Sequence, residues 1–354
     1  MQRCLQLAEM GAGYVAPNPM VGAVLVYNGR IIGEGYHQKF GEAHAEMNCI
    51  NSVGIEDKRY IYQSTLYVSL EPCAHFGKTP PCTNLIIENK IPNVVIGCKD
   101  NSEAVNGKGI EKLRTAGVKV IVGILEMESL DLNKRFYTFH QHKRPYIILK
   151  WAQSSDGKIG DPSKPPPAAV GEAYKDADNK RLLISNDLTN RLVHQWRSEE
   201  AAILVGTKTA LLDDPVLTTR LWPGNNPVRL VIDKELKLPS SLKLFDGSIR
   251  TIVFNYNKKE DGEMLSYYQL NKRENVLAQI LSVLFLHKIQ SVIVEGGAKL
   301  LQSFIDEGLW DEARVISNEQ LAIGNGTGAP VLKYNTLIRE QKIDNDIVSF
   351  FIHT

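Results

Sequence analysis

The chain has no long hydrophobic run and no excess of either charge. Its 354 residues include 41 Lys and Arg and 40 Asp and Glu, which gives a net charge of +1. No apolar segment approaches the roughly 18–20 residues of a membrane span, and the N-terminal MQRCLQLAEMGAG lacks the apolar core of a signal peptide. We therefore expect a cytoplasmic protein that binds neither a membrane nor a nucleic acid.

Cysteines are few, and none follows residue 98. The five are Cys4, Cys49, Cys73, Cys82 and Cys98, an odd number in a chain without a secretion signal. An odd count crowded into the first hundred residues of a long chain argues against a disulfide framework. It favours thiol or metal chemistry in that part of the chain.

The length predicts two domains, since one domain usually takes about 100–200 residues. In the first part, the strand-like segments 21–36, 65–70 and 93–98 alternate with helix-like segments. Such alternation predicts an α/β domain with a largely parallel sheet and helices on both faces. Residues 127–145 are expected to form one closing amphipathic helix, which places the domain boundary between residues 144 and 145.

A second α/β pattern occupies the rest of the chain. The expected strands are 146–152, 201–206, 228–233, 250–256, 291–297 and 346–353, and the expected helices are 186–199 and 274–289. Residues 161–181, which include three consecutive prolines, are expected to form a surface loop.

A metal site is predicted from His44, Cys73 and Cys82. Zinc takes His and Cys ligands, and a hydrolytic zinc keeps one position open for water. Cys73 follows a strand and a proline in SLEPC, so it should lie at the carboxyl edge of the sheet. His44 and Cys82 each stand at the expected start of a helix, where the helix dipole favours a thiolate.

Glu46 follows His44 by two residues in HAEMNCI and is expected to carry protons rather than to bind metal. Hydrolysis of an amidine needs a group that moves a proton to the ring nitrogen and to the departing amine. His-x-Glu together with Pro-Cys-x-x-Cys is the signature of zinc deaminases. Here the two thiols are separated by eight residues in place of two, and Cys49 and Cys98 lie in apolar segments that favour core positions.

The segments PNPMVGAVLV, GEAHAE and EPCAHFGKTPPC closely resemble the bifunctional deaminase–reductase of riboflavin biosynthesis, over nearly the whole chain. The resemblance implies that residues 1–144 form a zinc-dependent deaminase domain with the three-layer α/β/α cytidine-deaminase fold. This domain would hydrolyse the 2-amino group of a diaminopyrimidinone ribosylamine phosphate. Residues 145–354 would form a dihydrofolate-reductase-like α/β domain that uses NADPH to reduce the ribose to a ribityl chain. One zinc ion per chain and a homodimer paired through the reductase domain are also implied.

The same resemblance implies individual contacts. In the deaminase domain, Asn18 should contact the substrate, and His75 and Lys78 should face its ring or phosphate. In the reductase domain, the implied cofactor contacts are Gln153, Thr209, Asp213, Gly296 and Gly297, and the implied substrate contacts are Arg197, Leu217, Arg220 and Glu295. Arg197 and Arg220 suit a phosphate, because a guanidinium group can bind two phosphate oxygens at once.

One departure from the family pattern leaves a second interpretation open. RLLISN (181–186) replaces the usual segment, and Leu183 stands in its aromatic position. The chain is therefore either a two-step enzyme or a deaminase with a non-catalytic second domain. A tRNA-editing deaminase would need a basic stripe with exposed aromatics, which this near-neutral chain lacks. A purely structural zinc would need a fourth protein ligand.

Overall fold

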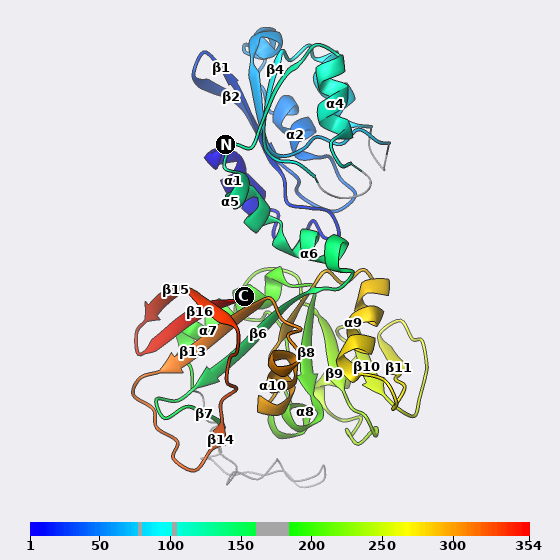
Figure 1. The fold of residues 1–354 in the computed structure, drawn as a ribbon, viewed down its shortest axis with the longest axis vertical. Helices are drawn as coiled ribbons and strands as arrows, with labels where there is room; N and C mark the ends of the chain where they lie inside the picture. Colours follow the sequence, from blue (N-terminus) through cyan, green and yellow to red (C-terminus); the bar gives the residue numbers. More distant parts are fainter. Residues whose placement is uncertain (77–79, 101–104, 161–183) are drawn as a thin grey trace. The chain divides into compact units, whose positions relative to one another are not determined.

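The computed structural model describes residues 1–76, 80–100, 105–160 and 184–354 (Figure 1). Lys78, Leu183 and the expected loop 161–181 lie outside these residues. The chain divides into two compact units, Met1–Arg144 and Pro145–Thr354. No helix of the described residues is long and apolar enough to cross a membrane.

The first unit contains a five-stranded sheet in the order β2-β1-β3-β4-β5. The strands are β1 (Gly22–Tyr27), β2 (Arg30–Tyr36), β3 (Thr65–Leu70), β4 (Asn93–Cys98) and β5 (Lys119–Val122). The helices are α1 (Gln2–Glu9), α2 (Ala45–Asn51), α3 (Cys82–Glu88), α4 (Lys108–Thr115), α5 (Glu126–Leu132) and α6 (Lys134–His142), with a 3-10 turn at Lys58–Gln63. β3, β4 and β5 run parallel, but β1 is antiparallel to both β2 and β3. The prediction of a largely parallel sheet is therefore wrong for the β1 side, which is built from the Asn28-Gly29 hairpin.

Alternate residues of β1 place helices on opposite faces of this sheet. A Cβ at Gly22 would lie 2.0 Å from the carbonyl oxygen of Cys4, so α1 packs directly on that face. The neighbouring Ala23 belongs to the opposite core, where it clusters with Ala45 and Cys49 of α2. The predicted three-layer α/β/α arrangement is confirmed.

The expected closing helix 127–145 is two helices, α5 and α6, which break at Asn133. The Asn133 side chain is 2% exposed. It accepts a hydrogen bond from the Met20 backbone N–H at 2.8 Å and donates one to the Met20 carbonyl at 2.9 Å. A backbone φ of −105° and ψ of 21° at Asn133 separates the two helices. The prediction of one helix is wrong because a long-range contact, which hydrophobic spacing does not reveal, interrupts it.

The second unit contains a nine-stranded sheet in the order β11-β10-β9-β8-β12-β6-β13-β16-β15. Its strands are β6 (Tyr146–Gln153), β8 (Ala202–Gly206), β9 (Val228–Ile232), β10 (Thr251–Asn255), β11 (Leu265–Gln269), β12 (Ser291–Val294), β13 (Glu312–Asn318), β15 (Asn335–Ile343) and β16 (Asp346–His353), and a separate pair joins β7 (Lys158–Gly160) to β14 (Thr327–Gly328). The helices are α7 (Asp187–Glu199), α8 (Thr207–Asp213), α9 (Val276–Leu286) and α10 (Ala298–Asp306), with a 3-10 turn at Lys243–Phe245. From β11 to β13 the strands are parallel, and β16 and β15 are antiparallel additions.

Side chains of β6 alternate between two cores. Ile147 and Leu149 pack in one core with α9 and α10, whereas Tyr146 and Ile148 pack in the other with Trp196 of α7. The strands are thus covered on both faces, as parallel sheets require. The carboxyl ends of β8, β12 and β6 lie side by side, where open α/β sheets place their ligands.

Candidate deaminase and reductase sites

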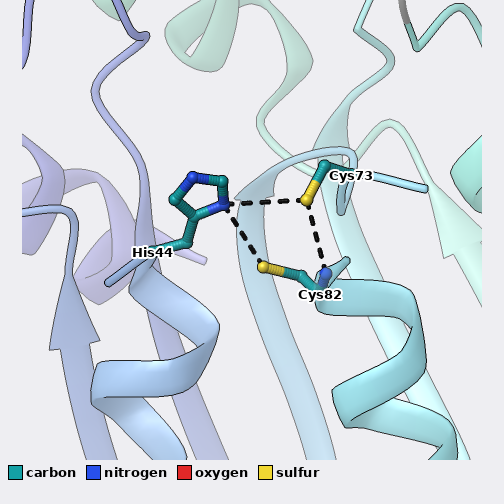
Figure 2. A group of neighbouring side chains, drawn as sticks. All are labelled: His44, Cys73 and Cys82. Carbon is teal, nitrogen blue, oxygen red and sulfur yellow. Dashed lines mark hydrogen bonds between the residues drawn. The ribbon is translucent and has the colours of Figure 1, made fainter. Parts of the chain in front are cut away.

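His44, Cys73 and Cys82 converge at one end of the first sheet (Figure 2). His44 is the N-cap of α2, Cys82 is the first residue of α3, and Cys73 follows the end of β3 by three residues. The His44 Nδ1 atom lies 3.6 Å from Cys73 Sγ and 3.4 Å from Cys82 Sγ. All three ligand atoms lie within 4.8 Å of one another. The predicted convergence of two helix starts on one strand end is present in the structure.

These separations fit a tetrahedral zinc ion. With Zn–S of about 2.3 Å and Zn–N of about 2.0 Å, tetrahedral N and S ligands lie about 3.5 Å apart. The two measured N···S separations are 3.6 and 3.4 Å. Three protein ligands leave a fourth position for water or substrate, which is the arrangement of hydrolytic zinc sites.

The surroundings of Cys73 favour its thiolate form. A hydrogen bond with Cys82 lowers the pKa of the Cys73 thiol to about 4 against the effect of burial, and His44 acts in the same direction. The Cys82 backbone N–H also donates to Cys73 Sγ at 3.3 Å. The pKa of Cys82 is raised, because this thiol donates to Cys73 and is buried. Cys73 thus carries the negative charge of the pair, which attracts a cation.

Glu46 lies in the first turn of α2 and is 3% exposed. Burial raises the pKa of its carboxyl group, and negative charge on Cys73 adds to the effect. A carboxyl group with a raised pKa exchanges protons closer to neutrality than an exposed glutamate does. Its position beside the three ligands suits proton transfer.

Asn18 is connected to the predicted metal ligand His44 through His37, a residue that sequence reasoning missed. Asn18 Nδ2 lies 3.1 Å from His37 Nε2, and His37 Nδ1 lies 3.1 Å from the Ala43 carbonyl. The His37 ring packs edge-on against His44, with centroids 5.3 Å apart. The carbonyl contact implies that His37 donates from Nδ1 and accepts from Asn18 at Nε2. His75 is exposed two residues after Cys73.

Glu71 is a second residue that sequence reasoning missed, although it lies only two residues before Cys73. Glu71 is 4% exposed, and among the described residues four backbone N–H groups donate hydrogen bonds to its carboxylate. The donors are Asp100, Gly107, Gly109 and Ile110, at 2.9 to 3.2 Å. This carboxylate ties the chain before Cys73 to the start of α4.

In the second unit, two helices begin side by side at the carboxyl ends of β8 and β12. A Cβ at Gly296 would lie 2.7 Å from the Gly206 nitrogen and 2.8 Å from Val205 Cα, so a side chain is excluded there. The Gly297 N–H donates to Thr209 Oγ1 at 2.7 Å. Gly296, Gly297 and Thr209, predicted as cofactor contacts, are thus neighbours, and backbone can approach a ligand closely beside the start of α10.

Arg197 and Glu295 form a buried two-point ion pair. Arg197 Nε and Nη2 each lie 2.7 Å from a Glu295 carboxylate oxygen, and Lys150 Nζ lies 3.6 Å from the same carboxylate. Burial would raise the pKa of Glu295, but the charges of Arg197 and Lys150 together hold it at about 2. Bidentate binding of phosphate by Arg197 would require breaking this pair, which sequence reasoning did not foresee.

The remaining predicted reductase residues have different surroundings. Gln153 accepts from Trp151 Nε1 at 2.9 Å and donates to Ser317 Oγ at 3.2 Å. Asp213 ends α8 and is exposed, as is Arg220. The Leu217 side chain is 3% exposed and packs in the core, so a substrate would meet the backbone at this position.

Comparisons with known proteins find relatives for both halves of the chain. Residues 1–98 match the cytidine and deoxycytidylate deaminase zinc-binding region, and residues 145–333 match the RibD C-terminal domain. The riboflavin biosynthesis protein RibD of Aquifex aeolicus is 39% identical, covering 99% of this chain and 97% of that protein. The RibD protein of Escherichia coli is 33% identical, covering 88% and 84%.

Solved structures give the same result. The diaminohydroxyphosphoribosylaminopyrimidine deaminase/5-amino-6-(5-phosphoribosylamino)uracil reductase of Thermotoga maritima matches with a TM-score of 0.86 at 35% identity, covering 100% of this chain and 97% of that one. RibD of Acinetobacter baumannii matches with a TM-score of 0.84 at 28% identity, covering 100% and 97%. The chain therefore belongs to the RibD family of bifunctional riboflavin-biosynthesis enzymes, with a zinc-binding deaminase domain and an NADPH-dependent reductase domain.

Proposed function

We propose that residues 1–144 deaminate 2,5-diamino-6-(5-phosphoribosylamino)pyrimidin-4(3H)-one and that residues 145–354 reduce the product, 5-amino-6-(5-phosphoribosylamino)uracil. The Thermotoga maritima relative carries both activities in its name and covers the whole chain. The observation that carries the proposal is the trio of His44, Cys73 and Cys82 with the buried Glu46 beside it.

In the deaminase step, His44, Cys73 and Cys82 hold zinc, which when bound supplies Lewis-acid activation of water. Glu46 takes a proton from the attacking water and delivers protons to the ring nitrogen and the departing ammonia. Asn18, His75 and Lys78 bind the substrate. His37 supports Asn18, because its Nε2 atom accepts from the amide N–H and leaves the amide oxygen to face a substrate amino group.

In the reductase step, NADPH supplies the hydride when bound. Gln153, Thr209, Asp213, Gly296 and Gly297 are proposed to hold it. The proposed substrate residues are Arg197, Leu217, Arg220 and Glu295. Leu217 contributes its backbone, and the positive charge of Arg220 attracts the phosphate. Glu295, held in place by Arg197 and Lys150, would face the substrate with a fixed orientation of its carboxylate.

A two-step assay on the purified chain tests both assignments. With the diaminopyrimidinone substrate and NADPH, we expect ammonia release followed by loss of absorbance at the nicotinamide band. Normal ammonia release without NADPH oxidation, even with the deaminated substrate added directly, would instead favour a deaminase with a non-catalytic second domain.

We further propose a cytoplasmic homodimer paired through the reductase domain. β15 is the last strand in its sheet order and pairs with β16 on one side. Its Leu337 and Ile338 are 46% and 52% exposed, which is unusual for an edge strand of a monomer. Light scattering should give twice the chain mass, and Ile338→Lys should shift it toward the monomer. Wild type at the monomer mass would refute the dimer, and cell fractionation tests the location.

A further inference from the structure

Arg229 is a fully buried arginine near the start of β9, the third strand from one edge of the reductase sheet. It belongs to β9 and is 0% exposed. Its guanidinium pairs with Asp246, from Nη1 to Oδ1 at 2.7 Å, and Nη2 lies 3.5 Å from Ser248 Oγ. A buried arginine needs acceptors for its donors, and here three of them are backbone carbonyls of loops that cover the sheet.

Two loops meet at this guanidinium. Arg229 Nε donates to the Val216 carbonyl at 3.0 Å, and Nη1 donates to the Lys243 and Leu244 carbonyls at 3.2 and 3.4 Å. The same loops are joined by a second contact, in which the Lys243 N–H donates to Asp214 Oδ1 at 2.8 Å. Arg229 therefore connects residues 214–218 to residues 243–248 through hydrogen bonds.

Residues 216–218 are held at three successive points. The Val216 carbonyl binds Arg229, the Leu217 side chain is buried in the core, and the Thr218 carbonyl accepts from Arg197 Nη1 at 3.2 Å. Leu217 has a φ of +55°, a conformation that non-glycine residues rarely adopt. A strained backbone of this kind persists where its surroundings hold it in place.

This segment leads directly to Arg220 and lies next to the Arg197–Glu295 pair. Arg229 of β9 binds the loop at the Val216 carbonyl, and Arg197 of the proposed substrate site binds it at the Thr218 carbonyl. The loop therefore connects β9 to the proposed substrate site. The two attachments precede Arg220 by four and two residues.

We propose that Arg229 is a positioning residue of the reductase, which sets the substrate-binding conformation of residues 214–220 without touching the substrate. The inference rests on the proposed substrate role of this loop. Lysine in place of Arg229 keeps the charge, but its three donors share one nitrogen. The Val216 carbonyl is bound by Nε, whereas the Leu244 carbonyl and Asp246 are bound by Nη1, so one ammonium group cannot replace these contacts together.

The test compares Arg229→Lys with Arg314→Lys, a matched control. Arg314 is also buried in this unit, at 5% exposure, and pairs with Glu312 at 2.6 Å. It lies over the Trp196 ring rather than beside the loop. Steady-state constants for 5-amino-6-(5-phosphoribosylamino)uracil and for NADPH are measured together with thermal unfolding. Ammonia release by the other domain of the same chain is the internal control.

We expect Arg229→Lys to raise the KM for the uracil substrate about tenfold, since small misplacements of binding groups have effects of this order. The KM for NADPH and the rate of ammonia release should stay within about twofold of wild type. Arg314→Lys should lower the unfolding temperature without changing the KM for the uracil substrate.

Lower unfolding temperature with unchanged KM in Arg229→Lys, or an equal change of KM in both variants, would overturn the proposal.

If Arg229→Lys does not fold, Asp246→Asn takes its place, because it releases the guanidinium from a partly exposed partner. It should raise the same KM, and an unchanged KM would again overturn the proposal. Arg220→Ala distinguishes failure of the proposed substrate role of the loop from failure of the positioning role of Arg229. An unchanged KM for the uracil substrate in Arg220→Ala refutes the substrate role of the loop. A raised KM in Arg220→Ala together with normal kinetics in Arg229→Lys refutes the role of Arg229 alone.

Discussion

Alanine at Gly296 is expected to disturb NADPH binding because it forces apart two strand ends. The added Cβ would lie 2.7 Å from the Gly206 nitrogen and 2.8 Å from Val205 Cα. Since such contacts normally lie at about 3.5 Å or more, the end of β12 must move by about 0.8 Å. Both obstructing atoms are backbone atoms, so no side-chain rotation can relieve the clash.

The cost of this overpacking should be about 1–3 kcal/mol in the free energy of unfolding of the reductase domain. The displaced backbone also carries Gly297, whose N–H binds Thr209. We therefore expect the dissociation constant for NADPH, measured by fluorescence titration, to rise about tenfold, which corresponds to about 1.4 kcal/mol. Ammonia release by the other domain should not change.

Gly206→Ala is the matched control for this variant. A Cβ at Gly206 meets the Leu300 side chain at 3.8 Å, an ordinary contact, and its backbone is extended, with φ of −93°. It should bind NADPH and unfold like wild type. Equal unfolding free energies and equal NADPH affinities for Gly296→Ala and Gly206→Ala would refute the reasoning.

Three further outcomes are expected. Glu46→Gln should retain zinc by elemental analysis but lose ammonia release by about 10²–10⁴-fold, and retained activity would exclude the proton-transfer role. Removing the metal with a chelator should stop ammonia release, leave NADPH oxidation with the deaminated substrate intact, and be reversed by zinc. His194 should make the reductase domain less stable as the pH falls from about 6.5 toward 4, because burial and the positive charges of Arg197 and Arg220 lower its pKa to about 4 in the folded state. The unfolded chain then binds the proton first, so denaturant unfolding at pH 7 and pH 5 should show a smaller loss of stability in His194→Gln, and an equal loss would contradict the assignment.

Local patterns in the sequence predicted most helices, the metal ligands and many of the strands, but they missed β11, β13 and β15 of the second sheet. His44, Cys73 and Cys82 could be found because each stands at a recognisable boundary, a helix start or a strand end followed by proline. The break at Asn133 could not be found, because it depends on a hydrogen-bonded contact with Met20, far away in the chain.

Buried polar residues were the other class that sequence reasoning missed. Alternation in VRLVID places Arg229 on a face of the sheet, but its burial comes from loops that fold over that face. His37 lacks the spacing of a metal ligand, and its role depends on Asn18 and Ala43 in three dimensions. The ion pair of Arg197 with Glu295 joins residues 98 positions apart. None of these contacts leaves a local pattern in the sequence.

The strand order of the second sheet has a consequence for the synthesis of the chain. β6 is made first but lies between β12 and β13, so Tyr146 pairs with Ser291 and Ile148 pairs with Glu312. The apolar segment YIILKWAQ therefore leaves the ribosome long before either neighbouring strand exists. In the first sheet, by contrast, β1 can pair with β2 at once. Sheets that depend on distant pairings fold slowly and expose apolar strands meanwhile. The reductase half should therefore depend on chaperones during translation more than the deaminase half does.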